Sequence, residues 1–217
     1  MSFRPPFLVK VCGLTSEVDV DLAVSAGADA VGVVSYSPSI RHVTDEHAAA
    51  LLARRTEGVQ GVLVVVDAMR DELEQRVRAV GADLVQLCGN ESPEDFVNFP
   101  VPILRRVPVD SRALEEMRAW RRVPATFLLD HPASPGGSGR GVDLALARDL
   151  CAAEPCVLAG GLEAEVVADR VAATGASAVD ASSRLESSPG VKDPEAVRAF
   201  VRGARRALGM EIKEATK

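Results

Sequence analysis

Two residues capable of acid–base chemistry end apolar runs of this sequence. Cys12 ends the run FLVKVC, and Asp130 ends the run TFLLD. A thiolate is a workable general base once its pKa is lowered, and a carboxylic acid can donate a proton to an oxygen. Isomerisation of a sugar needs both steps, so Cys12 and Asp130 form the candidate catalytic pair. The alternatives are a packed core thiol at Cys12, a loop cap at Asp130, and His131 as the acid.

Glycine and serine gather at three later points of the chain, in the stretches GGSGRG, AGGL and DASSR. Glycines let backbone N–H groups approach an anion, and serine hydroxyls add further donors. Three such clusters, each after an apolar run, favour a phosphate site over flexible turns. The predicted phosphate-binding residues are Gly136, Gly137, Ser138, Gly139, Gly160, Gly161, Ser182, Ser183 and Arg184.

Short apolar runs rich in β-branched residues must position these groups. They are FLVKVC, AVGVVS, GVLVVV, LVQLC, PILRRVPV, TFLLD, CVLAG and AVDAS. The helix-like segments between and after them include 19–27, 44–55, 70–80, 93–98, 111–121, 143–152, 164–174 and 194–208. Near-continuous apolar strands that alternate with helices indicate a parallel sheet covered on both faces. Eight such units predict an α/β fold, a single-domain (β/α)8 TIM barrel with parallel strands over residues 1–217.

A doubly wound open sheet is the alternative fold. No G-x-G-x-x-G follows the first run, which counts against a dinucleotide site. In a barrel, chemistry lies at the C-terminal ends of the strands, so Cys12 and Asp130 are expected across the barrel mouth from each other. Arg41, in the loop after the second run, could hold a carboxylate by two parallel hydrogen bonds. Its spacing alone favours an exposed charge instead.

Composition excludes several classes of protein. The net charge of −6 argues against a nucleic-acid binder, which needs a basic surface. With 47% hydrophobic and 26% charged residues the chain is neither disordered nor membranous, and no run approaches the ~20 apolar residues of a membrane helix. The four cysteines lack C-x-x-C spacing, so no metal site is expected. No secretory signal is visible, so we expect a cytoplasmic protein with free thiols.

Over nearly its whole length the sequence resembles the phosphoribosylanthranilate isomerase family of tryptophan biosynthesis. The motifs that carry the resemblance are VKVCGLT, GADAVGVV, SPSIRHV, VQLCG, LLD, GGSGRGVD, VLAGGL and VDASSRLESSPGVKD. Their order along the chain agrees with the barrel. The first and the last of them are specific to the family.

The resemblance implies an Amadori rearrangement of N-(5'-phosphoribosyl)anthranilate to 1-(2-carboxyphenylamino)-1-deoxyribulose 5-phosphate. Cys12 would remove the proton at sugar C2, Asp130 would protonate the ring oxygen, and Arg41 would face the anthranilate carboxylate. The glycine and serine clusters would hold the phosphate. No cofactor or metal is implied, because the protonated imine itself accepts the electrons. The expected partner is this phosphorylated amino-sugar, bound by a monomer or a homodimer. Further substrate-binding residues expected beside it are Gln86, Cys88 and Asp180.

Two positions depart from the family pattern. The family usually has histidine where Cys88 stands and glycine where Arg184 stands. If that loop needs a positive φ, Arg184 carries strain that a bond to phosphate or carboxylate would offset, so we expect it to be a ligand. A paralogous barrel isomerase acting on a related amino-sugar phosphate, and a non-catalytic phosphosugar-binding barrel, remain alternatives. The loss of Cys12 or Asp130 would have favoured the non-catalytic reading.

Overall fold

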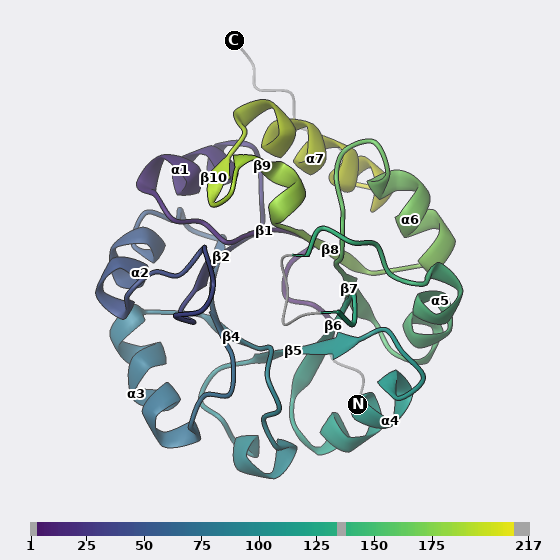
Figure 1. The fold of residues 1–217 in the computed structure, drawn as a ribbon, viewed down its shortest axis with the longest axis horizontal. Helices are drawn as coiled ribbons and strands as arrows, with labels where there is room; N and C mark the ends of the chain where they lie inside the picture. The colour runs from purple at the N-terminus through teal and green to yellow at the C-terminus, as the bar shows by residue number, and fades with distance from the viewer. Residues whose placement is uncertain (1–3, 134–137, 211–217) are drawn as a thin grey trace.

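The computed structural model describes residues 4–133 and 138–210 of the chain. Eight parallel strands close into a barrel in which each strand pairs with its neighbours in chain order, and β8 pairs with β1 (Figure 1). The predicted barrel is therefore confirmed, and the open sheet is excluded. The strands are β1 (Val9–Cys12), β2 (Ala30–Val34), β3 (Gln60–Val65), β4 (Leu84–Leu87), β5 (Ile103–Pro108), β6 (Ala125–Asp130), β7 (Cys156–Leu158) and β8 (Ala178–Ala181).

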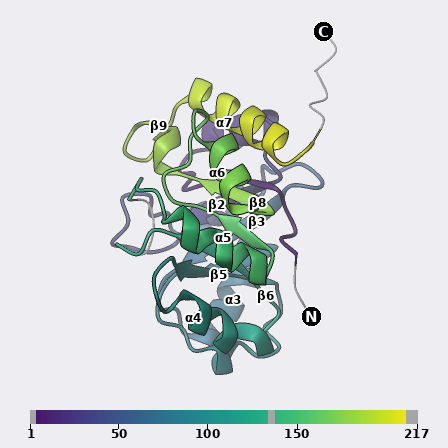
Figure 2. The same ribbon diagram turned by 90° about the vertical axis from the view of Figure 1, so that its right-hand side faces the viewer.

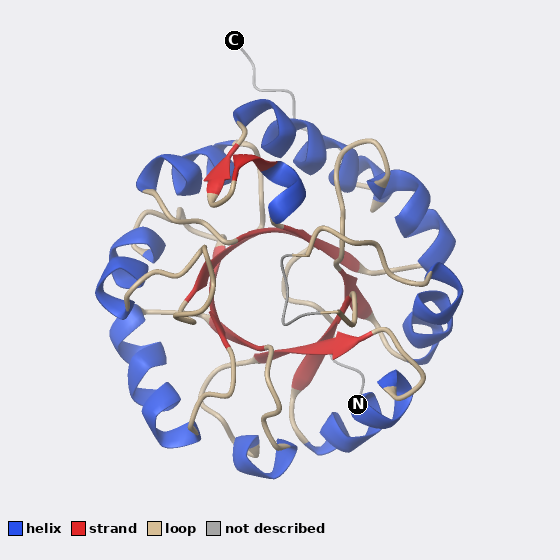
Figure 3. Ribbon diagram, viewed as in Figure 1, coloured by secondary structure: helices blue, strands red, loops and turns tan. Residues whose placement is uncertain are grey.

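Seven α-helices of the described residues form a ring outside the strands (Figures 1 and 3). Capping explains where several begin: Ser16, Thr44, Asp143 and Asp193 each accept a hydrogen bond from a backbone N–H in the first turn. None of the helices in this part of the chain is long and apolar enough to cross a membrane. The helices are α1 (Glu17–Ser25), α2 (Asp45–Leu52), α3 (Arg70–Val80), α4 (Ala113–Ala119), α5 (Leu144–Ala153), α6 (Val167–Thr174) and α7 (Pro194–Ala207).

The connection between β4 and β5 differs from the helix expected at residues 93–98. It holds only a single 3-10 turn, η1 (Pro93–Phe96), and Asn98 after it has a φ of 59°. A left-handed residue ends helical geometry at once, and the segment is too short to form further turns. Two more 3-10 turns, η2 (Trp120–Arg122) and η3 (Ser183–Leu185), follow α4 and β8.

A short hairpin after β8 was not predicted. Strands β9 (Glu186–Ser188) and β10 (Val191–Lys192) pair antiparallel in the segment ESSPGVK. Viewed from the side, the segment around β9 lies at one end of the barrel (Figure 2). The sequence signal was weak because each strand is very short and neither alternates in hydrophobicity.

Side chains point alternately outward and inward along each strand, and this separates two apolar clusters. Val9 and Val11 pack in the large cluster between the strands and the helices, whereas Cys12 belongs to a smaller cluster inside the barrel. Side chains two residues apart share a face, so Lys10 also points into the barrel. The strand that carries the candidate base therefore places a second polar side chain one layer beneath it.

Candidate active site

A cavity of about 360 Å³ opens at the C-terminal ends of the strands. Residues of β1, β4, β6, β8 and the loop after β2 converge on it, although they are far apart in the sequence. Seven of the residues singled out in the sequence line this one cavity. They are Cys12, Arg41, Gln86, Cys88, Asp130, Asp180 and Ser182.

Cys12 lies at the inner rim of β1 with 6% of its surface exposed. Burial raises the pKa of its thiol above the ordinary value, and the positive charge of Lys10 opposes that shift. The sulfur is thus not in a purely apolar environment, as a packing cysteine would be. Cys88 lines the same cavity on β4's C-terminal side, and there burial raises the thiol pKa to about 12.

Asp130 ends β6 with its carboxylate held from two sides. Its Oδ1 accepts a hydrogen bond from the His131 N–H at 2.8 Å, and its Oδ2 accepts one from Arg106 Nε at 3.3 Å. Arg106 also donates to the His131 carbonyl at 2.8 Å, which fixes the loop after the strand. His131 Nδ1 accepts from the Ala133 N–H, so that ring engages its own loop, and of the two residues Asp130 lines the cavity.

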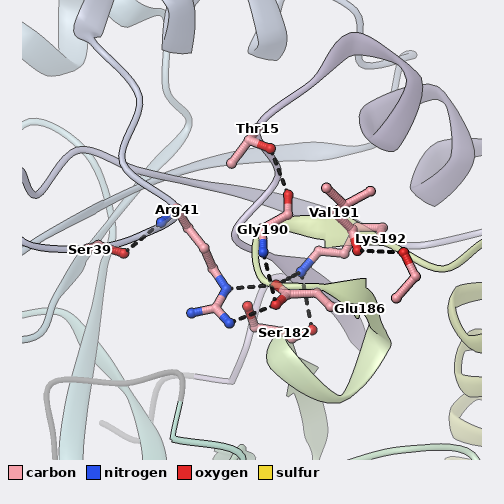
Figure 4. A network of polar contacts seen from close by, with 9 residues as sticks. Thr15, Ser39, Arg41, Ser182, Glu186, Gly190, Val191 and Lys192 are labelled. Carbon is pink, nitrogen blue, oxygen red and sulfur yellow. Dashed lines mark hydrogen bonds and ion pairs between the residues drawn. The ribbon is translucent and has the colours of Figure 1, made fainter.

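Arg41 is buried, with only 8% of its surface exposed, so the exposed-charge interpretation is wrong. Its Nε and Nη2 donate to the two carboxylate oxygens of Glu186 at 2.6 and 2.8 Å (Figure 4). This two-point pair orients the guanidinium while its outer edge reaches the cavity. The pair joins the β2 loop to the hairpin that follows β8.

The hairpin holds Glu186 through further contacts (Figure 4). Lys192 Nζ donates to Glu186 Oε1 at 2.8 Å, and the Gly190 N–H donates to Oε2 at 3.2 Å. Thr15, in the loop after β1, donates to the Gly190 carbonyl at 2.8 Å. Burial alone would favour the neutral acid, but the bonds from Arg41 and Lys192 lower the pKa of Glu186 to about 2.

A small recess beside the cavity gathers the loops that follow β6, β7 and β8. It shares Asp130, Asp180 and Ser182 with the cavity. Gly161 in this recess has a φ of 64°, and a Cβ there would lie 2.8 Å from the Gly139 carbonyl oxygen. Two loops therefore approach each other closely only because the side chain is absent. Gly136 and Gly137 fall outside the described residues. The predicted phosphate residues that line the recess are Ser138, Gly139, Gly160, Gly161, Ser182, Ser183 and Arg184.

Comparison with known families identifies the arrangement. The family model described as N-(5'phosphoribosyl)anthranilate (PRA) isomerase matches residues 9–203. The chain belongs to the phosphoribosylanthranilate isomerase family. A relative from Rhodopseudomonas palustris (strain BisA53), named N-(5'-phosphoribosyl)anthranilate isomerase, is 42% identical over 92% of this chain and 96% of its own. The resemblance seen in the motifs is confirmed.

Solved structures of the phosphoribosylanthranilate isomerase family share the fold. The enzyme from Thermotoga maritima superposes with a TM-score of 0.84 at 29% identity, covering 92% of this chain and 99% of its own. A structure of such an isomerase in complex with reduced 1-(o-carboxyphenylamino)-1-deoxyribulose 5-phosphate superposes with a TM-score of 0.82, at 29% identity and the same coverage. The second of these proteins binds a phosphorylated analogue.

The backbone of Arg184 is not strained. The described non-glycine residues with a positive φ are Asp67 and Asn98, and Arg184 lies instead in the 3-10 turn η3. The condition on which the expected strain depended, a positive φ at this position, is therefore not met, because the 3-10 turn bends the chain without one. The exposed side chain reaches across the recess, and its Nε donates to the Gly139 carbonyl at 3.0 Å.

Two residues of the site escaped the sequence reasoning. Lys10 is fully buried beneath the cavity, where it donates to Asp180 Oδ1 at 2.9 Å and to Gln86 Oε1 at 3.0 Å. A charged residue two positions before Cys12 in a buried strand was the available signal, because both then face the barrel interior. Glu186 gave no such signal, since its partner Arg41 lies far from it in the sequence.

Proposed function

We propose that this chain catalyses the Amadori rearrangement of N-(5'-phosphoribosyl)anthranilate, with Asp130 as general acid and Cys12 as general base. Asp130 protonates the ring oxygen, and the ring opens to a protonated Schiff base. The Cys12 thiolate then takes the proton from C2, and the electrons of the C–H bond neutralise the iminium to give an enolamine that tautomerises to the ketone. The observation that supports this most strongly is that both groups line one cavity, from β1 and β6.

The recess beside the cavity suits the 5-phosphate. Gly139, Gly160 and Gly161 line it together with Ser182 and Ser183. Unhindered backbone N–H groups and hydroxyl donors are what a phosphate dianion needs. The guanidinium of Arg184 stands at the rim and adds a positive charge there.

Arg41 suits the anthranilate carboxylate. Glu186 engages its Nε and Nη2, and among the described residues no side chain accepts from Nη1. A substrate carboxylate can therefore bind Nη1 without displacing Glu186. Gln86, Cys88 and Asp180 complete the wall and floor around the sugar and the aryl group. The reaction as written needs no cofactor, because the iminium nitrogen accepts the electrons.

The same proposal places the protein in the cytoplasm, as a monomer or a homodimer that acts on this phosphorylated amino-sugar. It competes with a paralogous isomerase that acts on a related amino-sugar phosphate and with a non-catalytic phosphosugar-binding barrel. Retention of Cys12 and Asp130 at one cavity favours an enzyme over the latter. Growth of a tryptophan auxotroph that lacks this isomerase, when it carries the gene for this chain, would show that the substrate is phosphoribosylanthranilate. Failure to grow would favour the paralogous isomerase or the non-catalytic barrel.

The roles of the pair are tested by Cys12→Ser and Asp130→Asn. A serine hydroxyl is too weak a base and an amide donates no carboxylic proton, so each should lower turnover by at least ~10²-fold. Loss of substrate fluorescence reports turnover, and circular dichroism reports the fold. Cys151→Ser and Asp149→Asn are matched controls on α5 that should keep activity. A folded variant of the pair with near-normal activity would exclude that residue from its role.

A further inference from the structure

Lys10 forms a buried polar cluster beneath the reaction cavity. Its side chain is inaccessible to solvent, and two of the donors on Nζ bind Asp180 and Gln86 at 2.9 and 3.0 Å. An ammonium has three donors, so one remains for a third acceptor. Burying a lysine this completely is costly unless its charge is matched, and Asp180 provides one matching charge.

The Cys12 sulfur lies in the same small volume as the Lys10 ammonium. The two residues lie on one face of β1, and the positive charge of Lys10 lowers the pKa of the Cys12 thiol against the effect of burial. Gly32, directly opposite Cys12 on β2, leaves the space for both. A Cβ at Gly32 would lie 2.8 Å from Cys12 Sγ and 3.3 Å from Lys10 Nζ, so the two atoms converge on one small volume.

Other charged groups around the sulfur are already paired with each other. Arg41 and Lys192 both bind Glu186, and Arg106 binds Asp130. Cys88, directly after β4, is held neutral, because burial raises the pKa of its thiol. The charged and titratable groups that face Cys12 are Lys10 of β1, Arg41 of the β2 loop, Cys88 after β4, Asp130 of β6, Asp180 of β8 and Lys192 of β10.

We propose that Lys10 is the positioning residue that allows Cys12 to act as a base, by holding its thiolate against a buried ammonium, and that Asp180 competes for the same ammonium. This rests on the role of Cys12 proposed above. When the thiolate takes the C2 proton it loses its charge, and Asp180 remains as the anionic partner of Lys10. The ammonium is therefore never left buried without an anion at any step. Asp180 thus does more than line the cavity, because it limits how strongly Lys10 favours the thiolate.

The proposal predicts opposite effects of two substitutions on one measurable quantity. Lys10→Met removes the stabilising charge, and Asp180→Asn removes the competing one. The pH midpoint of Cys12 alkylation by iodoacetamide should rise by about one unit or more in the first variant and fall in the second. The midpoint is compared, not a single rate, because a more basic thiolate is also the better nucleophile. Gln86→Met, which removes the neutral partner of the same ammonium, should leave the midpoint nearly unchanged.

Trypsin makes the readout specific for Cys12. Cleavage after Arg41 places Cys12 on a peptide that contains none of the other three cysteines, in wild type and in Lys10→Met alike. Mass spectrometry of that peptide gives the alkylated fraction at each pH. Lys10→Met leaves Asp180 buried without its ion-pair partner and could fail to fold for that reason. In that case the double variant Lys10→Met/Asp180→Asn, which removes both charges, is measured in its place. The double variant should still lack the low-pH alkylation seen in Asp180→Asn.

An unchanged midpoint in the folded Lys10 variant, or shifts of the same sign in the Lys10 and Asp180 variants, would overturn the proposal. A purely structural lysine would change stability and leave the alkylation midpoint in place. The readout does not depend on turnover, so it stands apart from the proposed function. If Cys12→Ser stays active while the midpoints shift as expected, the base assignment fails and the coupling of Lys10 to the thiol survives.

Discussion

Two of the five N–H donors of Arg41 are committed to Glu186, and this fixes the guanidinium that we propose binds the substrate carboxylate. A charge-assisted hydrogen bond contributes about 1.5–3 kcal/mol, and 1.4 kcal/mol corresponds to a factor of ten. Arg41→Ala should therefore raise KM for phosphoribosylanthranilate roughly tenfold to a hundredfold, with a smaller change in kcat. Steady-state kinetics with fluorescence detection measure both constants.

Lysine should not rescue this position. An ammonium cannot donate two parallel bonds to Glu186 and a third to the substrate in one plane, so Arg41→Lys should keep most of the KM increase. Arg54→Ala is the matched control, because Arg54 makes the same two-point pair with Asp21 on the protein surface. An unchanged KM in Arg41→Ala would remove Arg41 from the substrate site.

At the residue scale, the sequence predicts the polar side chains at the C-terminal ends of strands. It misses side chains that only the fold brings together. Cys12 and Asp130 were expected to face each other because strand ends lie on the functional side of a barrel, and both do line one cavity. Glu186 could not be predicted as part of the site, because its role depends on the ion pair with Arg41, and Arg41 lies far away in the sequence, in the loop after β2. The burial of Arg41 was missed for the same reason.

At the scale of elements, the recess that we propose binds the phosphate depends on loops that pack backbone against backbone. Gly161→Ala forces a left-handed alanine, which costs roughly 1–2 kcal/mol, and places a Cβ against the Gly139 carbonyl oxygen. The loops should separate, and the affinity for reduced 1-(o-carboxyphenylamino)-1-deoxyribulose 5-phosphate should fall about tenfold or more. Isothermal titration calorimetry measures that affinity.

Gly58→Ala provides the matched control. Gly58 has a φ of 87°, and a Cβ there would have no atom within 4 Å, so the substitution brings the same kind of backbone strain away from the recess. It should lower stability by a similar amount and leave ligand affinity unchanged. Equal affinities in the two variants would show that the approach of the two loops is not needed for binding.

The strands were predictable because each is a short, largely apolar run between helix-like segments, and all eight are present. Connections were less predictable. The link at residues 93–98 begins with a proline and two acidic residues, as the first turn of a helix often does, yet only one 3-10 turn forms there. The hairpin β9–β10 has no periodicity of its own and exists because Glu186 and Lys192 pair within it and reach the β2 loop.

At the scale of the whole molecule, the barrel is closed by the contact between β8 and β1, and α7 covers that seam. Phe200 of α7 is fully buried in the layer between the helices and the strands. Removing a buried phenyl ring costs about 3–5 kcal/mol, which is a large part of the stability of an ordinary domain. Loss of the Phe200 side chain therefore weakens the packing of α7 over the contact that closes the barrel.

Phe200→Ala should lower the urea midpoint of the whole barrel, not of α7 alone. Trp120, the sole tryptophan, lies in η2, directly after α4. Helix α4 lies on the opposite side of the barrel from α7 (Figure 1). A closed barrel cannot lose the β8–β1 contact and keep the opposite strands in register. The urea midpoints measured by Trp120 fluorescence and by far-UV circular dichroism should therefore fall by the same amount. Val18→Ala, at a side chain that is 75% exposed on α1, is the control and should shift neither. If the urea midpoint measured by Trp120 fluorescence stays unchanged while the midpoint measured by circular dichroism falls, the chain unfolds in independent parts. That result would contradict the prediction of a single domain.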